Sequence, residues 1–195
     1  MIRYGAATAL VVVDVQNDFA DPAGSLSVRG GDAIVPMIDE EIERALAAAA
    51  FVAYTQDWHP ESTPHFAKDG GVWPVHCVRD TWGAELHPGL TIAGPVVRKG
   101  TNGEDGYSGF TMRDPVTGET IPTELEGLLR EHGVRRVVTC GLATDYCVSA
   151  TAIDAAAAGF RSIVLLDCVR AVDLQPGDGD RAIERMAAAG VRIEG

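Results

Sequence analysis

Long apolar segments are missing from this sequence, and no run is long enough to span a membrane. The apolar run at residues 6–13 is short, is ended by Asp14 and is followed by no small-residue cleavage site. We therefore predict a buried strand there and not a signal peptide. Without a targeting or membrane-spanning segment, the expected location is the cytoplasm.

Basic residues are also scarce, because 16 Lys and Arg stand against 28 Asp and Glu, for a formal net charge of -12. Nucleic acids and anionic membranes repel a protein of this charge, so neither is an expected partner. A small-molecule ligand in a pocket of different local charge is compatible with this composition. Whether the chain forms a homo-oligomer is left open by the sequence.

Cysteine is limited to four residues, and no two of them form a Cys-x-x-Cys pair. This spacing argues against a paired zinc knuckle and against a dense disulfide scaffold. A redox role for Cys77 with Cys147 therefore has no support. The sequence also contains neither a Gly-x-Ser-x-Gly nucleophile elbow nor a Gly-rich phosphate loop.

What is present is a regular alternation of strand-like and helix-like segments. Strands are predicted at residues 9–13, 50–55, 95–98, 134–140, 162–166 and 191–194. Helices are predicted at residues 32–50, 123–132, 145–158 and 179–189. The alternation indicates βαβ units, and hence a single α/β domain over residues 1–195 with a three-layer α/β/α arrangement around a mostly parallel central sheet. Two long segments remain, 56–93 and 99–120, and we predict that they are functional loops.

Chemically active side chains follow the predicted strands. Asp14 follows the first strand, Asp57 and His59 follow the second, Lys99 follows the third, and Cys147 comes a short turn after the fourth. In open parallel sheets, ligands bind outside the carboxyl ends of the strands. We therefore expect these side chains to meet at one edge of the sheet.

Cys147 has two interpretations. A free cysteine is commonly a buried apolar residue, and that role requires no chemistry. As a nucleophile, Cys147 would be assisted by the predicted helix N-terminus and by Lys99, which both favour the thiolate, and by Asp14 as a proton acceptor. Backbone N–H groups between residues 142 and 147 would then hold an oxyanion. That combination of Asp14, Lys99 and Cys147 suits acyl transfer at an amide carbonyl.

The stretch DWHPESTPHF, with the following WPVHC, concentrates metal-ligand residue types. Asp57 and His59 are two apart and point to the same side of an extended segment. His65 can return to them through a Pro-rich turn, and His76 follows. One Asp and three His form an oxygen–nitrogen ligand set suited to one divalent ion, zinc, iron or manganese. The alternative is that these are unconnected surface histidines of a loop.

Five segments in this order, VVVDVQNDF, DWHPESTPHF, WPVHC, RKG…YSGF and GLATDYCV, resemble the nicotinamidase/pyrazinamidase family of the isochorismatase-like cysteine hydrolases. The resemblance implies the α/β/α fold of that family and a catalytic triad of Asp14, Lys99 and Cys147. It also implies roles for three further sets of residues: metal ligands Asp57, His59, His65 and His76; oxyanion donors Ala143 and Cys147, aimed by a non-proline cis peptide between Leu142 and Ala143; and a substrate pocket lined by Phe19, Trp73 and Tyr107.

The implied activity is hydrolysis of nicotinamide to nicotinate and ammonia through a cysteine thioester, with a metal ion holding the pyridine nitrogen. A related cysteine hydrolase that acts on another small amide is the alternative. Members of that kind generally keep the triad but lack the metal cluster, which is complete here. One departure is the acidic pair Glu104 and Asp105 near the expected pocket mouth, which leaves the range of substrates undetermined.

Overall fold

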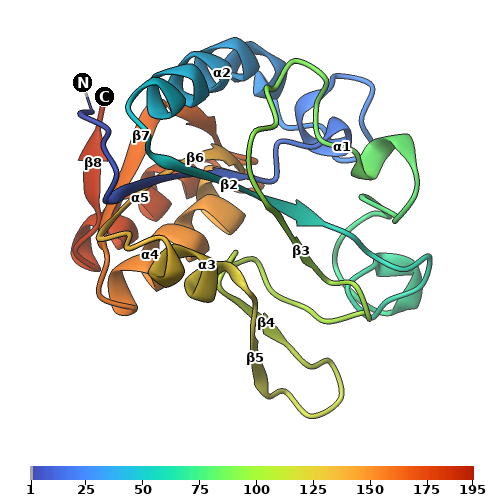
Figure 1. Cartoon of the computed structure of the whole chain (residues 1–195). Coiled ribbons are helices and arrows are strands. Elements are labelled where there is room, and N and C mark those ends of the chain that lie inside the picture. Colours follow the sequence, from blue (N-terminus) through green and yellow to red (C-terminus); the bar gives the residue numbers. More distant parts are fainter. Residues whose placement is uncertain (1) are drawn as a thin grey trace.

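The computed structural model of the protein describes residues 2–195 and is built around a six-stranded sheet (Figure 1). The strand order is β3-β2-β1-β6-β7-β8, and every neighbouring pair is parallel. The strands are β1 (Thr8–Val13), β2 (Phe51–Asp57), β3 (Val96–Lys99), β6 (Arg136–Leu142), β7 (Arg161–Arg170) and β8 (Arg192–Glu194). The order reverses between β1 and β6, so the ligand crevice of this fold is expected at the carboxyl ends of these two strands.

Helices cover both faces of the sheet, and the predicted three-layer α/β/α fold is confirmed. In Figure 1, α2 (Gly31–Ala47) lies over one face, while α3 (Leu125–Glu131), α4 (Ser149–Ala157) and α5 (Asp178–Ala188) lie on the other. Alternate residues of β1 enter the two cores, because successive side chains of a strand point to opposite faces. Leu10 packs in the core that α2 covers, and Val11 packs in the opposite core with residues of α3 and α4.

Element bounds differ from the predicted ones where local sequence does not specify them. The first long helix ends at Ala47, three residues before the predicted end, because the chain turns at Ala48 and Ala49 to enter β2. The segment predicted as a long loop after Lys99 contains an antiparallel hairpin of β4 (Thr111–Arg113) and β5 (Thr120–Pro122). Its strands are too short to give a periodic pattern.

Three short helical segments lie near the carboxyl ends of the strands. The first is α1 (Asn17–Ala20), which directly follows the turn after β1. The others are 3₁₀ turns in the segment after β2, at Ala67–Asp69 and Trp82–Ala84. The turn at Trp82–Ala84 packs against α1, so part of the segment of residues 56–93 lies beside the end of β1.

The connection from β6 to α4 is not the simple α-helix start that the sequence suggests. Residues Thr144–Val148 form one π-helical turn, and α4 begins only at Ser149. Cys147 therefore lies inside the π-turn, and π-turns occur frequently at functional sites.

Gly141, in β6, allows the strand to approach β1 closely. Its φ is +116°, and a Cβ there would lie 2.1 Å from the carbonyl oxygen of Val13. We expect Gly141→Ala to lower the free energy of unfolding by about 3 kcal/mol, because both the backbone conformation and the contact oppose a side chain. Chemical denaturation measures this. Gly118→Ala is the control, since φ there is +72° but nothing lies within 4 Å. Equal losses at the two positions would contradict the close-approach argument.

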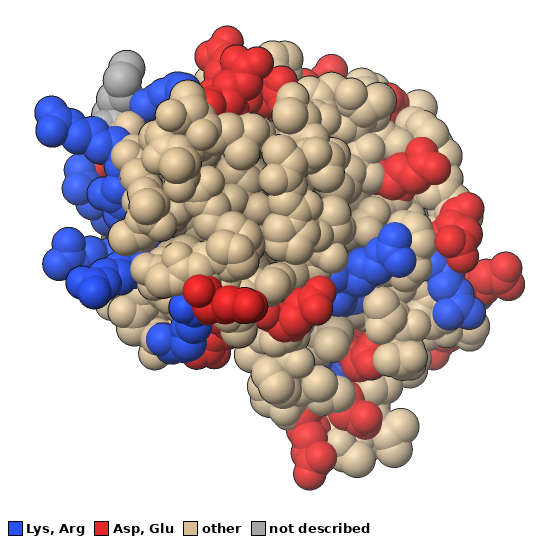
Figure 2. Space-filling model, in the orientation of Figure 1, with Lys and Arg blue, Asp and Glu red and all other residues tan. Residues whose placement is uncertain are grey.

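The surface charge is unevenly distributed. On the face in Figure 2, acidic side chains gather over α2, and a group of basic side chains gathers at the edge beside the N-terminus, where the strands begin. Among the described residues, no helix is long and apolar enough to cross a membrane.

Candidate active site

The carboxyl ends of four strands bring the predicted residues together. Asp57 and Lys99 are the last residues of β2 and β3 and are direct neighbours across the sheet. Asp14 follows β1, and Cys147 follows β6 after the π-turn begins, so these two flank the reversal in strand order. The expectation that the strand ends converge is met in the structure.

Asp14, Lys99 and Cys147 form one buried cluster. The ammonium nitrogen of Lys99 lies 2.8 Å from Oδ2 of Asp14 and donates to the Cys147 sulfur at 3.7 Å. A carboxylate oxygen of Asp14 and the sulfur lie within 4.8 Å of each other. Thr55 donates from its hydroxyl to Oδ1 of Asp14 at 2.6 Å, which orients the carboxylate. The cluster contains a thiol, a potential proton acceptor and a fixed cation in mutual reach.

The backbone of Asp14 is held in the left-handed region, with a φ of +49°. This conformation is uncommon for a residue other than glycine and is found at sites where the surrounding structure enforces it. It turns the carboxylate from the end of β1 back toward β3 and the π-turn.

Burial dominates the electrostatics of the cluster. It raises the pKa of the Cys147 thiol well above its ordinary value, with Lys99 lowering this pKa and Asp14 raising it. It also raises the pKa of Asp14, against the effect of the Lys99 ammonium. Burial lowers the pKa of Lys99, but Asp14 and Asp57 more than offset it, so Lys99 stays charged. The resting cysteine is thus a thiol and not the thiolate that Lys99 alone favours, and the neighbouring Asp14 is a stronger base than a surface aspartate.

Asp57 lies between this cluster and the histidines. Its Oδ1 forms an ion pair with Lys99, and its Oδ2 lies 3.9 Å from Nε2 of His59. Burial raises the pKa of Asp57, but Lys99 and the nearby histidines outweigh it, and the pKa falls to about 2. Asp57 is therefore a carboxylate with one oxygen facing each group.

The Asp57 backbone is held by a residue that the sequence reasoning missed. The side-chain amide of Gln16 donates to the Asp57 carbonyl and accepts from the Asp57 N–H, both at 2.8 Å. Gln16 lies in the VVVDVQNDF segment and is fully buried in the structure, but nothing in the sequence signals this contact.

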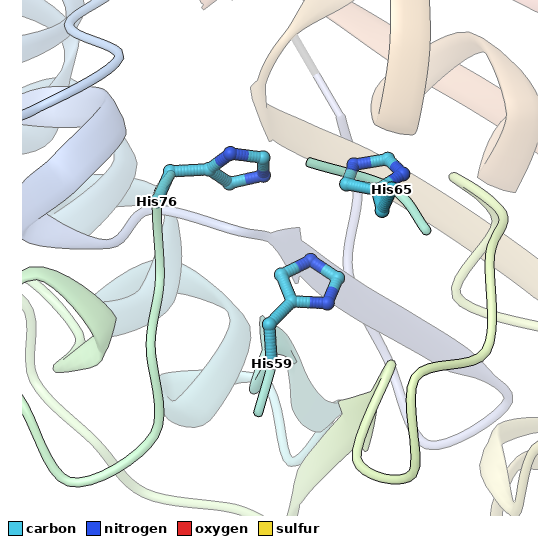
Figure 3. Close-up of side chains that lie close together, drawn as sticks. All are labelled: His59, His65 and His76. Atoms are coloured by element: carbon cyan, nitrogen blue, oxygen red, sulfur yellow. The ribbon is translucent and has the colours of Figure 1, made fainter. Parts of the chain in front are cut away.

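His59, His65 and His76 form a second cluster. One nitrogen of each ring lies within 4.8 Å of one nitrogen of the others. Figure 3 shows each ring turning a nitrogen toward the space between the three. Both ring nitrogens of His59 are buried and lack a hydrogen-bond partner within residues 2–195. Buried polar atoms are rarely left unpaired, so this arrangement fits a divalent ion that accepts the lone pair of one His59 nitrogen.

Gly100 makes room for the His59 ring. A Cβ at Gly100 would lie 2.6 Å from Nδ1 of His59. The glycine that directly follows β3 therefore lets the chain pass closely behind the histidine cluster.

The outer nitrogens of the other two histidines are hydrogen-bonded. Nδ1 of His76 lies 2.7 Å from the carbonyl oxygen of Pro74, and Nδ1 of His65 lies 2.8 Å from Oδ1 of Asp105. Because a carbonyl and a carboxylate can only accept, each Nδ1 carries a proton, and in the neutral ring each Nε2 has the lone pair. Outer partners of this kind orient metal-binding histidines.

A cavity opens beside both clusters. Its wall includes Asp57, His65, His76 and Cys147 and the aromatic residues expected there, Phe19, Trp73 and Tyr107. Trp73 donates from its indole nitrogen to the Tyr107 hydroxyl at 3.0 Å. The sequence reasoning missed Tyr146, whose ring packs edge-on against both Trp73 and Tyr107. Its position next to Cys147 in the sequence was the available signal. Other lining residues that were missed are Leu26, Val28 and Val172.

The peptide bond between Leu142 and Ala143 is cis, as the family resemblance implies. Ala143 and Cys147 both line the cavity, so the residues expected to donate to an oxyanion lie at its wall.

Comparison with known proteins agrees with this geometry. The isochorismatase domain family matches residues 8–194. The nicotinamidase of Acinetobacter baylyi is 39% identical over 205 residues, which cover 94% of this chain and 90% of that protein. The crystal structure of Pyrococcus horikoshii pyrazinamidase in complex with zinc has a TM-score of 0.86 at 41% identity, covering 96% of this chain and 98% of that one. The structure of PnC1 from L. infantum in complex with nicotinate has a TM-score of 0.87 at 37% identity, covering 99% and 95%.

Proposed function

The chain belongs to the isochorismatase family, and from this membership we propose that it is an amidohydrolase that converts nicotinamide to nicotinate and ammonia. The observation that carries the proposal is the cavity with Cys147 at its wall, where a thiol, a carboxylate and an ammonium lie beside three histidines. A thiol in this setting can attack a carbonyl, and the histidines distinguish the site from a simple cysteine hydrolase.

His59, His65 and His76, with Oδ2 of Asp57, would hold one divalent ion, and zinc, iron and manganese all suit this ligand set. When bound, such an ion supplies a Lewis acid beside the cavity that accepts the lone pair of a ring nitrogen. The unpartnered nitrogens of His59 and the fixed Nδ1–H groups of His65 and His76 support this assignment.

Asp14 is the proposed general base. It takes the proton from the Cys147 thiol as the sulfur attacks the carboxamide carbon, and it returns this proton to the departing ammonia. A water molecule then attacks the thioester carbon while Asp14 accepts its proton. The C–S bond breaks as Asp14 passes this proton to the sulfur, which restores the thiol and releases the acid product as nicotinate and a proton to solvent. Burial raises the pKa of Asp14, which makes this carboxylate a stronger base toward the thiol proton than an exposed aspartate.

Lys99 keeps the charges of this step in place. Its ammonium lies beside Asp14 and the sulfur, so it stabilises the thiolate when the proton moves to Asp14. The N–H groups of Ala143 and Cys147 are the proposed donors to the oxyanion of the tetrahedral intermediate.

The aromatic residues of the wall set the shape of the substrate. Phe19 and Trp73 offer flat apolar faces, and the hydrogen bond from Trp73 fixes the Tyr107 hydroxyl. A flat heteroaromatic ring is therefore the expected group next to the carboxamide.

The test of the proposal is ammonia release by the metal-replete protein from a panel of amides, with metal content measured on the same sample. Nicotinamide and pyrazinamide should be turned over well above non-aromatic amides and carbamoyl compounds. If a non-aromatic amide were turned over faster than nicotinamide, the proposed function would be wrong. The protein would then be another cysteine hydrolase of the same superfamily.

Replacing His59 tests the metal site. We expect His59→Ala to weaken metal binding by about 100-fold or more and to raise KM for nicotinamide, because a buried ligand is lost. Metal content by mass spectrometry and steady-state kinetics measure both effects. His132→Ala is the matched control, since this exposed histidine contacts the Leu128 carbonyl of its own helix and the ring of Phe51 at the start of β2. A His59→Ala protein with full metal content and normal KM would remove His59 from the site.

A further inference from the structure

The two acidic residues of the loop after β3 have different surroundings. Glu104 accepts hydrogen bonds from the side chain and the backbone N–H of Asn102, at 2.9 and 2.8 Å, and so closes its own loop. Asp105, the next residue, instead forms a hydrogen bond with His65, which lies 40 residues earlier in the sequence. Only one member of the acidic pair therefore touches the histidine cluster.

Asp105 is itself firmly placed. Its Oδ1 accepts from Nδ1 of His65 and from the N–H of Gly106, both at 2.8 Å, and its Oδ2 accepts from the Arg113 guanidinium at 2.6 Å. Its backbone exchanges two hydrogen bonds with Arg113, the last residue of β4, and these form an isolated antiparallel bridge. The carboxylate is thus held beside the turn end of the β4–β5 hairpin, where Arg113 pairs with Thr120.

The contact decides how the His65 ring is presented. A carboxylate can only accept, so the Nδ1 of His65 carries a proton, and in the neutral ring this leaves the lone pair on Nε2. The His65 side chain is 7% exposed, which leaves the ring little freedom to flip. His76 is oriented in the same way, but by the neutral carbonyl of Pro74. Asp105 is the one charged outer partner of the three histidines among the described residues.

We propose that Asp105 is a positioning residue for the metal site: it fixes the tautomer and orientation of His65 and makes its Nε2 a stronger ligand, with Arg113 anchoring the carboxylate. The inference rests on the metal site of the proposed function and adds to it a residue outside the ligand set. It also links the hairpin to the site, because Arg113 belongs to β4.

A purely structural role is the competing explanation. The ion pair between Asp105 and Arg113 closes the loop onto the hairpin, and it would do so without any metal. Stability alone does not separate the two roles, because both predict some loss when Asp105 is replaced. Metal affinity and the state of the His65 ring do separate them.

The experiment compares Asp105→Ala and Asp105→Asn with the parent protein and with Glu104→Gln as the control. Glu104→Gln removes the same charge one residue away but no contact to a histidine. The dissociation constant of zinc is measured by competition with a chromophoric chelator, and folding is checked by circular dichroism. We expect Asp105→Ala to weaken zinc binding by about 10- to 100-fold, Asp105→Asn to weaken it less because the amide still accepts, and Glu104→Gln to leave it near the parent value.

The metal-free proteins give a second readout. Nitrogen-15 NMR of labelled histidine should show His65 as the Nδ1–H tautomer in the parent, and a mixture of tautomers in Asp105→Ala. Arg113→Ala, at an exposed position, should weaken zinc binding in the same direction but by less. Unchanged zinc affinity and an unchanged His65 signal in folded Asp105→Ala would overturn the inference. Absence of zinc binding by the parent would instead reject the proposed metal site, and the inference with it.

Discussion

Cys147→Ala is expected to abolish the release of ammonia from nicotinamide, with a loss of at least about 10⁴-fold, while the fold survives. Among the described residues, Cys147 is the one cysteine at the cavity wall, and its sulfur lies within reach of both Asp14 and Lys99. Alanine keeps the backbone of the π-turn and leaves a small void. Metal-replete turnover with an ammonia assay measures the loss, and thermal unfolding reports the fold.

Cys140→Ala is the matched control for this experiment. Cys140 is also a buried free cysteine at the same sheet, but its sulfur faces the backbone carbonyl of Val11 and lies in the core under α2. The Cys140→Ala variant should show a loss in free energy of unfolding similar to that of Cys147→Ala, but it should keep the turnover of the parent protein. Substantial ammonia release by Cys147→Ala would contradict the covalent mechanism, whether or not the protein binds metal.

The protonation state of Cys147 in the free protein determines how fast an alkylating reagent reacts with it. Burial and Asp14 raise the pKa of the thiol, and Lys99 opposes them. The free protein therefore holds a thiol that becomes a thiolate only as Asp14 takes the proton. Slow alkylation of the free protein is compatible with a catalytic cysteine here, so turnover is the sharper measurement.

The sequence was sufficient to predict the site residues that sit at strand ends. Asp14, Asp57, Lys99 and Cys147 each follow a recognisable strand, and a parallel sheet brings such positions to one edge. The same reasoning singles out Asp105 near the pocket mouth but cannot find its role or those of Gln16 and Thr55, because these roles depend on contacts with segments about 40 residues away. Hydrophobic periodicity carries no information about which polar groups meet across loops.

The predictions of fold details were wrong where those details depend on short elements or on local backbone geometry. The alternation of strands and helices predicted the sheet and its helical layers. It did not predict the β4–β5 hairpin, whose strands have three residues each. It also placed Cys147 in the first turn of an α-helix, where the structure has a π-turn. Alanine-rich sequence after a strand indicates a helix but does not specify how the first turn is wound.

Asp14→Asn is the second change with a large expected effect. Asparagine has nearly the same shape, but it cannot accept the thiol proton, so kcat should fall by about 10³-fold or more. Asp14 does not line the cavity, so KM for nicotinamide and metal content should stay near the parent values. Steady-state kinetics with metal analysis on the same sample separates these quantities.

Two further measurements distinguish a base from a structural ion-pair partner. Lys99 keeps Asp57 as a partner when Asp14 becomes neutral, so the free energy of unfolding should fall only modestly, by about 1–3 kcal/mol. Thr55→Val removes the hydroxyl that orients Asp14 but leaves its charge, so it should lower kcat far less than Asp14→Asn does. If Asp14 served only to hold Lys99, the loss of kcat would follow the loss of stability across these variants. If Asp14 is the general base, kcat should fall sharply in Asp14→Asn even when the protein is fully folded and loaded with metal.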